Sequence, residues 1–303
     1  MNLDPIVGYY RKARAWVQGG AAHERTLELL GAMLAVQNAS KRQIASLHEV
    51  EFRVFSQWGD DGIIQWLVAN LPSLPKRFVE FGVEDYSESN TRFLMANSNW
   101  SGLVMDGSPA KIARLRRRTW FWRYGLTAIP CFVTRENVDA MITDWSAGEE
   151  IGLLHIDVDG NDYWLWDAIT CTSPGIVIME YNALFGSERA ITIPYAANFQ
   201  RHKAHYSGQY AGASLAALTH LAAIKGYALI GSNSAGNNAY YVRVDLLNNA
   251  LREVTVATAF VKPNFRDSRD LHGRLDYLPY HLRQASIRGL PVMNVVTGQV
   301  EPF

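Results

Sequence analysis

The sequence has little cysteine, no excess of one charge and no long hydrophobic run. Its two cysteines, Cys131 and Cys171, lie 40 positions apart without a CxxC pair, which indicates reduced thiols. Lysine plus arginine and aspartate plus glutamate both number 29, so no overall field favours nucleic acid. No apolar run approaches the roughly 20 residues of a membrane span, and the N-terminus has no signal-peptide pattern. We therefore expect a soluble cytoplasmic protein with no membrane span and no nucleic-acid partner.

The first 50 residues are predicted to form an N-terminal helical extension. Residues 21–47 contain no proline and only one glycine, Gly31, and they are rich in Ala, Leu, Gln and Glu. This composition favours one long helix or two stacked ones. The apolar residues keep no sustained heptad, which argues against a long coiled coil. The helix is either a cap on the following domain or the contact of a homodimer.

From residue 51 onward, short apolar runs alternate with helical stretches. The expected strands lie at 77–83, 101–107, 126–133, 151–160, 175–182, 227–231 and 239–244. The expected helices lie at 62–71, 89–98, 109–118, 135–146, 162–170 and 214–225. Continuous apolar strands between helices predict an α/β fold with a doubly wound, mostly parallel Rossmann-like sheet. The last two strands are expected to close it as an antiparallel hairpin, within a domain spanning 51–250. Residues 251–303 would form a C-terminal extension.

The loop after the first expected strand lacks the GxGxxG pattern of dinucleotide-binding proteins. In "FVEFGVEDYSESN" (78–90), Gly82 ends the strand and Glu84 stands where a second glycine is expected. A carboxylate there would repel a pyrophosphate. Asp106 follows 24 residues after Gly82, at the end of the second strand, where an acid would bind ribose hydroxyls. The loop suits a cofactor that carries a sulfonium and an ammonium, as S-adenosylmethionine does.

The ordered elements "SQWGDDGII", "VEFGVEDYSESNTRFL", "GLVMDGS", "LLHIDVDGNDYWLWDAI" and "IVIMEYN" resemble the motif series of class I methyltransferases, and most closely that of the FkbM-like family. The similarity spans about residues 55–245. It implies Glu80 and Gly82 at the methionine part of S-adenosylmethionine and Asp106 at the ribose, with Asn90 as a weaker candidate. We add Ser108 to this cofactor set. The alternatives are that Glu80 is a buried acid satisfied by loop N–H groups and that Asp106 only caps the next helix.

The segment "HIDVDGND" (155–162) brings one imidazole and three carboxylates together. Alternate strand positions share a face, so His155, Asp157 and Asp159 are expected to point the same way. Asp157 is a candidate general base, with His155 beside it, and Asp157 with Asp159 is a candidate Mg²⁺ site. The alternatives are a satisfied core histidine at His155 and a helix cap at Asp162. The resemblance places this element next to the acceptor pocket.

The long polar connection at 183–213 is predicted to be an insertion that acts as a lid. Its His205 is the alternative base, and its Tyr206 and Tyr210 suit a sugar or other polyhydroxyl acceptor. Glu180 and Asn182, at the end of the fifth strand, would complete the polar rim of the site. The alternative is an ordinary packed excursion that buries its tyrosines.

The predicted function is S-adenosylmethionine-dependent O-methylation of a glycan or related polyhydroxyl compound. Two alternatives are a nicotinamide-dependent oxidoreductase and a non-catalytic methyltransferase-like binding subunit. The arginines after residue 262 form either a solvated face or a patch for phosphates of the acceptor. The basic run "RLRRR" (114–118) alone does not favour nucleic acid.

Overall fold

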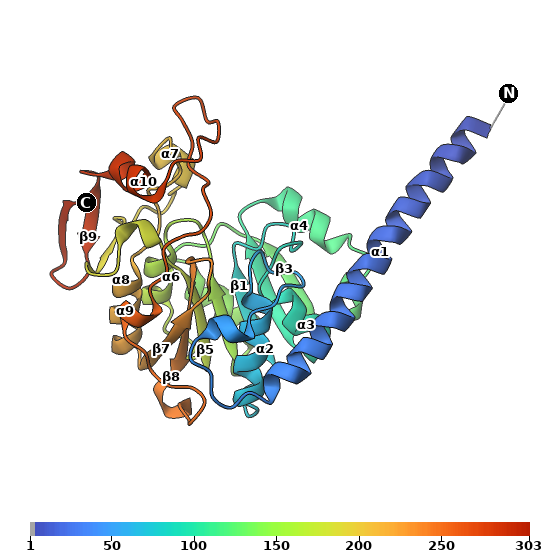
Figure 1. Cartoon of the computed structure of the whole chain (residues 1–303), viewed down its shortest axis with the longest axis horizontal. Coiled ribbons are helices and arrows are strands. Elements are labelled where there is room, and N and C mark those ends of the chain that lie inside the picture. Colours follow the sequence, from blue (N-terminus) through green and yellow to red (C-terminus); the bar gives the residue numbers. More distant parts are fainter. Residues whose placement is uncertain (1–3) are drawn as a thin grey trace.

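The computed structural model describes residues 4–303, with side chains from residue 22 onward. Its centre is a seven-stranded sheet with the order β3-β2-β1-β4-β5-β8-β7 (Figure 1). The strands are β1 (Arg77–Phe81), β2 (Ser101–Asp106), β3 (Leu126–Pro130), β4 (Leu153–Ile156), β5 (Ile176–Glu180), β7 (Tyr227–Ser232) and β8 (Asn238–Arg243). β1 to β5 are parallel, whereas β8 lies antiparallel between β5 and β7. The predicted fold class is confirmed, including the closing hairpin.

Helices cover both faces of this sheet, which explains why its central strands are apolar throughout. In β1, Val79 and Phe81 pack into one core cluster, whereas Phe78 packs into the cluster on the opposite face. The first face is covered by α5 (Val138–Ser146), α6 (Asp162–Ala168), α8 (Leu215–Ile224) and α9 (Val256–Ala259). The second face is covered by the 3-10 helix η1 (Leu47–Val50), α2 (Asp60–Asn70), α3 (Arg92–Ser98) and α4 (Pro109–Arg116).

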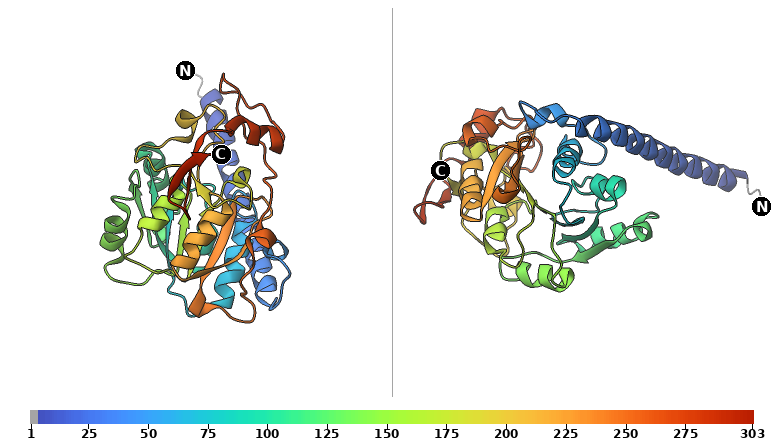
Figure 2. Two further views of the ribbon diagram at one scale, coloured as in Figure 1. Left: turned by 90° about the vertical axis from the view of Figure 1, so that its left-hand side faces the viewer. Right: turned by 90° about the horizontal axis from the view of Figure 1, so that it is seen from below.

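The N-terminal extension is a single helix, α1 (Asp4–Ala39), whose first part projects from the body (Figures 1 and 2). Gly31 lets the helix approach closely, because a Cβ there would lie 2.4 Å from Val54 Cγ2 and 2.8 Å from Phe93 Cζ. On the remaining surface Leu29, Met33 and Val36 are 68%, 69% and 76% exposed. None of the helices in residues 4–303 combines the length and the apolar character that a membrane crossing needs.

A second, three-stranded antiparallel sheet was not expected from the sequence. Its order is β10-β9-β6, with β6 (Ile191–Thr192) from the insertion and β9 (Pro291–Asn294) and β10 (Gln299–Pro302) from the C-terminal extension. The remaining helices are α7 (Arg201–Ala204) and α10 (Tyr280–Ile287), with 3-10 turns η2 (Phe121–Arg123), η3 (Ala183–Phe185) and η4 (Val244–Leu246). An apolar cluster joins the insertion to the chain end, so the two segments pack as one layer beside the main sheet (Figure 2).

Candidate active site

A cleft of about 600 Å³ lies at the carboxyl ends of the parallel strands. Doubly wound folds bind ligands at this edge, because the loops that follow the strands meet there. Among the described residues, nine carboxylate and two cationic side chains line it. The carboxylates belong to Asp60, Glu80, Glu84, Glu88, Asp106, Asp157, Asp159, Glu180 and Asp267, and the cations are Lys111 and Arg201. The cleft is therefore strongly acidic in a chain of zero formal net charge.

Glycine is the only residue type that fits at position 82, directly after β1. Its φ is +79°, and a Cβ there would lie 1.5 Å from the backbone oxygen of Asp157. A side chain would therefore clash with backbone in addition to adopting an unfavourable conformation. The close approach of these two loops shapes the centre of the cleft.

Glu84 directs its carboxylate outward from the same loop. The side chain is 71% exposed and pairs with Lys111 Nζ at 2.6 Å. Burial lowers the pKa of Lys111, but the hydrogen bond and charge of Glu84 raise it above the ordinary value. This ion pair lies at the rim of the cleft, so the charge of Glu84 there is balanced by Lys111.

Asp106 fixes the loop between β1 and β2 while remaining on the cleft surface. Its Oδ2 accepts a hydrogen bond from Glu84 N at 2.8 Å, and its Oδ1 accepts one from Ser108 N at 2.7 Å. Ser108 caps α4, since its Oγ accepts a weak hydrogen bond from Lys111 N at 3.4 Å. Asp106 thus lies on the cleft surface at the end of β2, and Ser108 lies behind it as a helix cap.

Glu80 is buried and fully engaged by the protein. Its carboxylate accepts hydrogen bonds from Ser89 Oγ at 2.6 Å, from the backbone of Asn90 and from both N and Oγ1 of Thr91. Burial alone would raise the pKa of Glu80, but its contact with His155 and these hydrogen bonds lower it. The interpretation of Glu80 as an acid satisfied by loop N–H groups describes its contacts well.

His155 is held on both sides of its ring. Nδ1 lies 2.9 Å from Glu80 Oε1, and Nε2 lies 3.2 Å from Asn90 Nδ2. The two strands are in register at this point, because Glu80 of β1 pairs with His155 of β4. The side chain is 3% exposed. His155 and Asn90 line the cleft as a fixed pair, consistent with a satisfied core histidine.

The expectation that His155, Asp157 and Asp159 share one strand face is wrong. β4 ends at Ile156, and Asp159 has a left-handed φ of +58°, so the chain has already turned. Asp162 holds this turn, because its carboxylate accepts hydrogen bonds from Val158 N at 2.8 Å and Gly160 N at 2.9 Å. All three predicted residues nevertheless line the cleft.

Asp157, Asp162 and Glu180 bring their carboxylates together at the ends of β4 and β5. One oxygen of each lies within 4.8 Å of the others. Burial raises the pKa values of Asp157 and Glu180 well above the ordinary range. The charges of Asp159 and Asp162 add to this effect at Asp157, and the charge of Asp157 adds to it at Glu180. Burial raises the pKa of Asp162 to about 6. Asp157 and Glu180 face the cleft, and they do not accept the two backbone N–H hydrogen bonds that engage Asp162.

The predicted Mg²⁺ pair does not assemble. Asp159 forms an ion pair with Arg201 and stays outside the carboxylate group described above. Within that group, Asp162 already accepts two backbone N–H bonds and has little capacity left for a hard cation, which prefers several oxygen ligands. The residues therefore fit a divalent ion poorly.

The other predicted residues of the insertion lie outside the cleft. Tyr210 packs in the apolar cluster of the insertion and chain end, and its hydroxyl donates to the backbone oxygen of Pro291. The His205 ring packs against that of the exposed Tyr206 at an interplanar angle of 40°, and its Nδ1 contacts Ser207 Oγ at 2.7 Å. Burial lowers the pKa of His205. The insertion does reach the cleft, but through Phe199 and Arg201.

Asn182 is a loop anchor beside the cleft. Its Nδ2 donates to the backbone oxygens of Gln209 and Ala211, both at 2.9 Å, and its Oδ1 accepts from Leu184 N. It lines a smaller hollow that shares Glu180 with the main cleft. β5 ends at Glu180, and only Glu180 of the two lines the main cleft, so Asn182 does not contribute to its polar rim.

Two aromatic residues that sequence reasoning missed form one wall of the cleft. Trp58 and Phe265 stack with ring centroids 5.7 Å apart and an interplanar angle of 25°. Trp58 lies in the "SQWGDDGII" element, whose position in the motif series was the only signal for it. In that element, Asp61 accepts hydrogen bonds from three backbone N–H groups, and Asp60 faces the cleft wall.

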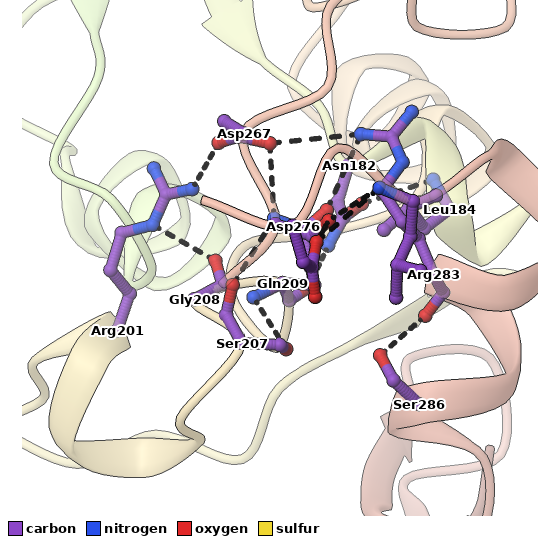
Figure 3. A network of polar contacts seen from close by, with 12 residues as sticks. Asn182, Leu184, Arg201, Ser207, Gly208, Gln209, Asp267, Asp276, Arg283 and Ser286 are labelled. Atoms are coloured by element: carbon purple, nitrogen blue, oxygen red, sulfur yellow. Dashed lines mark hydrogen bonds and ion pairs between the residues drawn. The ribbon is translucent and has the colours of Figure 1, made fainter. Parts of the chain in front are cut away.

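A polar network joins the insertion to the C-terminal extension above the cleft (Figure 3). Arg201 pairs with Asp159 and, at 3.0 Å, with Asp267. Asp267 also accepts from Gln209 Nε2 at 3.0 Å and lies 3.6 Å from the buried guanidinium of Arg283. Arg283 is therefore not part of a solvated arginine face. The network holds Asp267, from the C-terminal extension, at the cleft.

The basic run at 114–118 is used within the fold. Arg114 and Arg118 form ion pairs with Asp85 at 3.4 and 3.2 Å, and Arg116 donates to the backbone oxygen of Ala128. These contacts tie α4 to the loop after β1 and to β3.

No family model matches the chain, and a search of curated proteins finds no match. Among solved structures, it is similar to the N-terminal domain of EvdMO1 with SAH bound, at a TM-score of 0.39 and 11% identity. The similarity covers 62% of this chain and 80% of that one. It is too distant to assign a function, and the fold assignment rests on the sheet order. The resemblance to the FkbM-like family stays a prediction.

Proposed function

We propose that the protein is an S-adenosylmethionine-dependent O-methyltransferase whose acceptor is a sugar, a glycan or a related polyhydroxyl compound. The acidity of the cleft carries this proposal: nine carboxylates and two cations line it in a neutral chain. Carboxylates attract the sulfonium and the ammonium of this cofactor. They repel the diphosphate of a nicotinamide dinucleotide, which disfavours the oxidoreductase alternative.

The half of the cleft at β1 and β2 would bind the cofactor. Gly82 lets the loops after β1 and β4 approach closely, and Asp106 would present its carboxylate to the ribose hydroxyls. Met105, Phe132 and Val133 add apolar surface that suits a purine. Behind them, the carboxylate of Glu80 is satisfied by the protein, so its role would be to hold the loop rather than to contact the ligand.

Asp157 is the best-placed general base. Both ring nitrogens of His155 are engaged, and His205 lies outside the cleft, whereas the Asp157 carboxylate faces it beside Glu180. In the reaction, the acceptor oxygen attacks the methyl carbon, the carbon–sulfur bond breaks and sulfur takes the electron pair. The hydroxyl proton passes to Asp157. No step requires a metal ion.

The aromatic wall supports a polyhydroxyl acceptor. Trp58 and Phe265 offer stacked faces for the C–H surface of a sugar ring, and Phe199 lies on the same cleft. The carboxylates and amides around them provide hydrogen-bond partners for hydroxyl groups.

We also propose a homodimer through α1. Leu29, Met33 and Val36 recur at helical spacing and are all more than two-thirds exposed. Exposed apolar groups arranged in a stripe are typical of a contact surface, and a second copy of the helix presents the matching stripe.

Calorimetric titration with S-adenosylhomocysteine and with NAD tests the cofactor assignment. We expect binding of the former only, and its failure to bind would refute the proposal. A screen of glycan acceptors with labelled cofactor then tests catalysis. Cofactor binding without transfer to any acceptor would favour the non-catalytic alternative.

Two variants separate the halves of the site. Asp106→Ala should weaken S-adenosylhomocysteine binding about tenfold or more, the effect of losing a charged hydrogen bond. Asp157→Ala should leave that affinity unchanged and abolish methyl transfer. Equal loss of affinity in both variants would contradict this division of the cleft.

A further inference from the structure

One end of the cleft lies away from the cofactor half, where β5 meets β8. Glu180, the last residue of β5, pairs with Asn238, the first residue of β8, and both line the cleft. Carboxylates rather than hydrogen-bond donors surround Glu180: Asp157 and Asp162 lie within 4.8 Å of it. A ligand that reaches this end therefore meets a half-buried carboxyl that has no close cationic partner among the described residues.

Behind Glu180, the cleft wall contains buried acceptors with no donor. Asn238 Nδ2 donates to Asp60 Oδ1 at 2.9 Å, and that oxygen also accepts from Asn233 Nδ2 at 3.1 Å and from the hydroxyl of Tyr240. Asp60 Oδ2 and Asn238 Oδ1 are buried and have no hydrogen-bond partner. The residues are 0% and 3% exposed. Buried acceptors of this kind are rare in folded proteins and indicate a missing donor.

The cationic side chain on this side of the cleft, Arg201, already has partners within the protein. Among the described residues that line it, Arg201 is the cation near Glu180, and its guanidinium binds Asp159, Asp267 and the backbone oxygen of Gly208. An anionic acceptor would therefore meet net repulsion here. The stacked Trp58 and Phe265 complete the wall with aromatic faces, which attract cations.

We propose that the acceptor carries a protonated amine, which binds Glu180 and Asn238 Oδ1 beside the hydroxyl that faces Asp157. This inference rests on the proposed function and names its substrate class: an amino sugar or an aminocyclitol. An ammonium has three N–H donors and one positive charge, which match a carboxylate and an unpartnered amide oxygen. Adjacent strands lie about 4.8 Å apart, so the amine and the reacting hydroxyl would sit on neighbouring or next-neighbouring carbons.

Matched probes test the amine directly. Glucosamine and 2-deoxystreptamine are titrated into the full chain, alone and saturated with S-adenosylhomocysteine, with glucose and scyllo-inositol as neutral counterparts. We expect each amine to bind at least tenfold more tightly than its neutral counterpart. Glu180→Gln should remove most of that preference and leave S-adenosylhomocysteine affinity unchanged. Glu188→Gln, which removes an exposed carboxylate in the insertion, is the matched control and should change neither.

Several outcomes would overturn the inference. These are equal binding of amine and neutral probes, no measurable binding of either amine, or an amine preference that persists in Glu180→Gln. Binding of Mg²⁺ to the native chain but not to Glu180→Gln, without amine preference, would assign this position to a divalent cation instead. Failure of S-adenosylhomocysteine to bind, with the amine preference intact, would refute the cofactor assignment but not the amine site.

Discussion

At the residue scale, Gly82 occupies the position with the strictest steric requirement in the cleft. In Gly82→Ala the new Cβ would meet the backbone oxygen of Asp157 at 1.5 Å, so the two loops must separate. We expect a loss of stability of roughly 1–3 kcal/mol and at least a tenfold weaker affinity for S-adenosylhomocysteine. Chemical denaturation and calorimetry would measure the two effects.

Gly148 is the matched control for this prediction. Its φ is +84°, close to that of Gly82, but a Cβ there would meet nothing within 4 Å. Gly148→Ala should therefore show only the cost of the left-handed backbone, about 1 kcal/mol, and normal ligand affinity. Equal effects in both variants would mean that backbone conformation, not the loop contact, determines the behaviour of Gly82.

Asp157 should give the reaction a distinctive pH dependence. A base works only when ionised, so turnover should rise with pH through the pKa of this carboxyl. Burial and the charge of Asp159 raise that pKa, which places the midpoint well above the ordinary value of about 4. Asp159→Asn removes one of the raising charges, so we expect the midpoint of the kcat profile to move to lower pH. An unmoved midpoint would exclude Asp157 as the group that titrates.

At the scale of elements, the strands were easier to predict than the ends of strands. The parallel strands are buried on both faces, and their continuous apolar runs are therefore distinctive. The end of β4 could not be predicted from the sequence. It is set by a turn in which the Asp162 carboxylate accepts hydrogen bonds from the backbone N–H groups of Val158 and Gly160. The predicted alternation extended to Asp159, three residues beyond the end of β4, and therefore misplaced that side chain.

The second sheet escaped prediction for a related reason. β6 is only two residues long and gains its stability from pairing with β9, about a hundred positions later. Neither a hydrophobic period nor a turn signal can appear over so short a segment. Trp58 and Phe265 were missed similarly, since nothing in the local sequence of either indicates a partner more than 200 positions away.

The helix α1 carries the prediction about assembly. If its exposed stripe pairs with a second copy, the triple variant Leu29→Glu, Met33→Glu, Val36→Glu should convert a dimer into a 34.0 kDa monomer. Light scattering after size-exclusion chromatography measures the mass. Gln37→Glu adds a charge at an exposed polar position of the same helix and should leave the dimer intact. A monomeric native chain would contradict the proposal.

At the scale of the whole molecule, acidic and basic side chains are unevenly distributed although their numbers are equal. Equal numbers of acidic and basic residues conceal an acidic cleft. S-adenosylmethionine bears a sulfonium that S-adenosylhomocysteine lacks, so the former should bind more tightly at low salt. The advantage should shrink between about 0.1 M and 1 M salt, where the screening length falls from about 10 Å to about 3 Å. Calorimetry at the two salt concentrations, without acceptor, measures the ratio. Equal affinities at both would show that the carboxylates do not select the sulfonium.

The network of Arg201, Asp267 and Arg283 also has a consequence for the order in which the chain folds during synthesis. A ribosome delivers β1, β2 and β4 early, and N-terminal parts of a protein generally fold first during synthesis. Phe265 and Asp267 emerge more than 100 residues after β4, and the second sheet needs β9 and β10, which come later still. A nascent chain would therefore display an open, acidic sheet edge until these segments have been synthesised. The enclosure of the cleft therefore forms only after the strands that it covers.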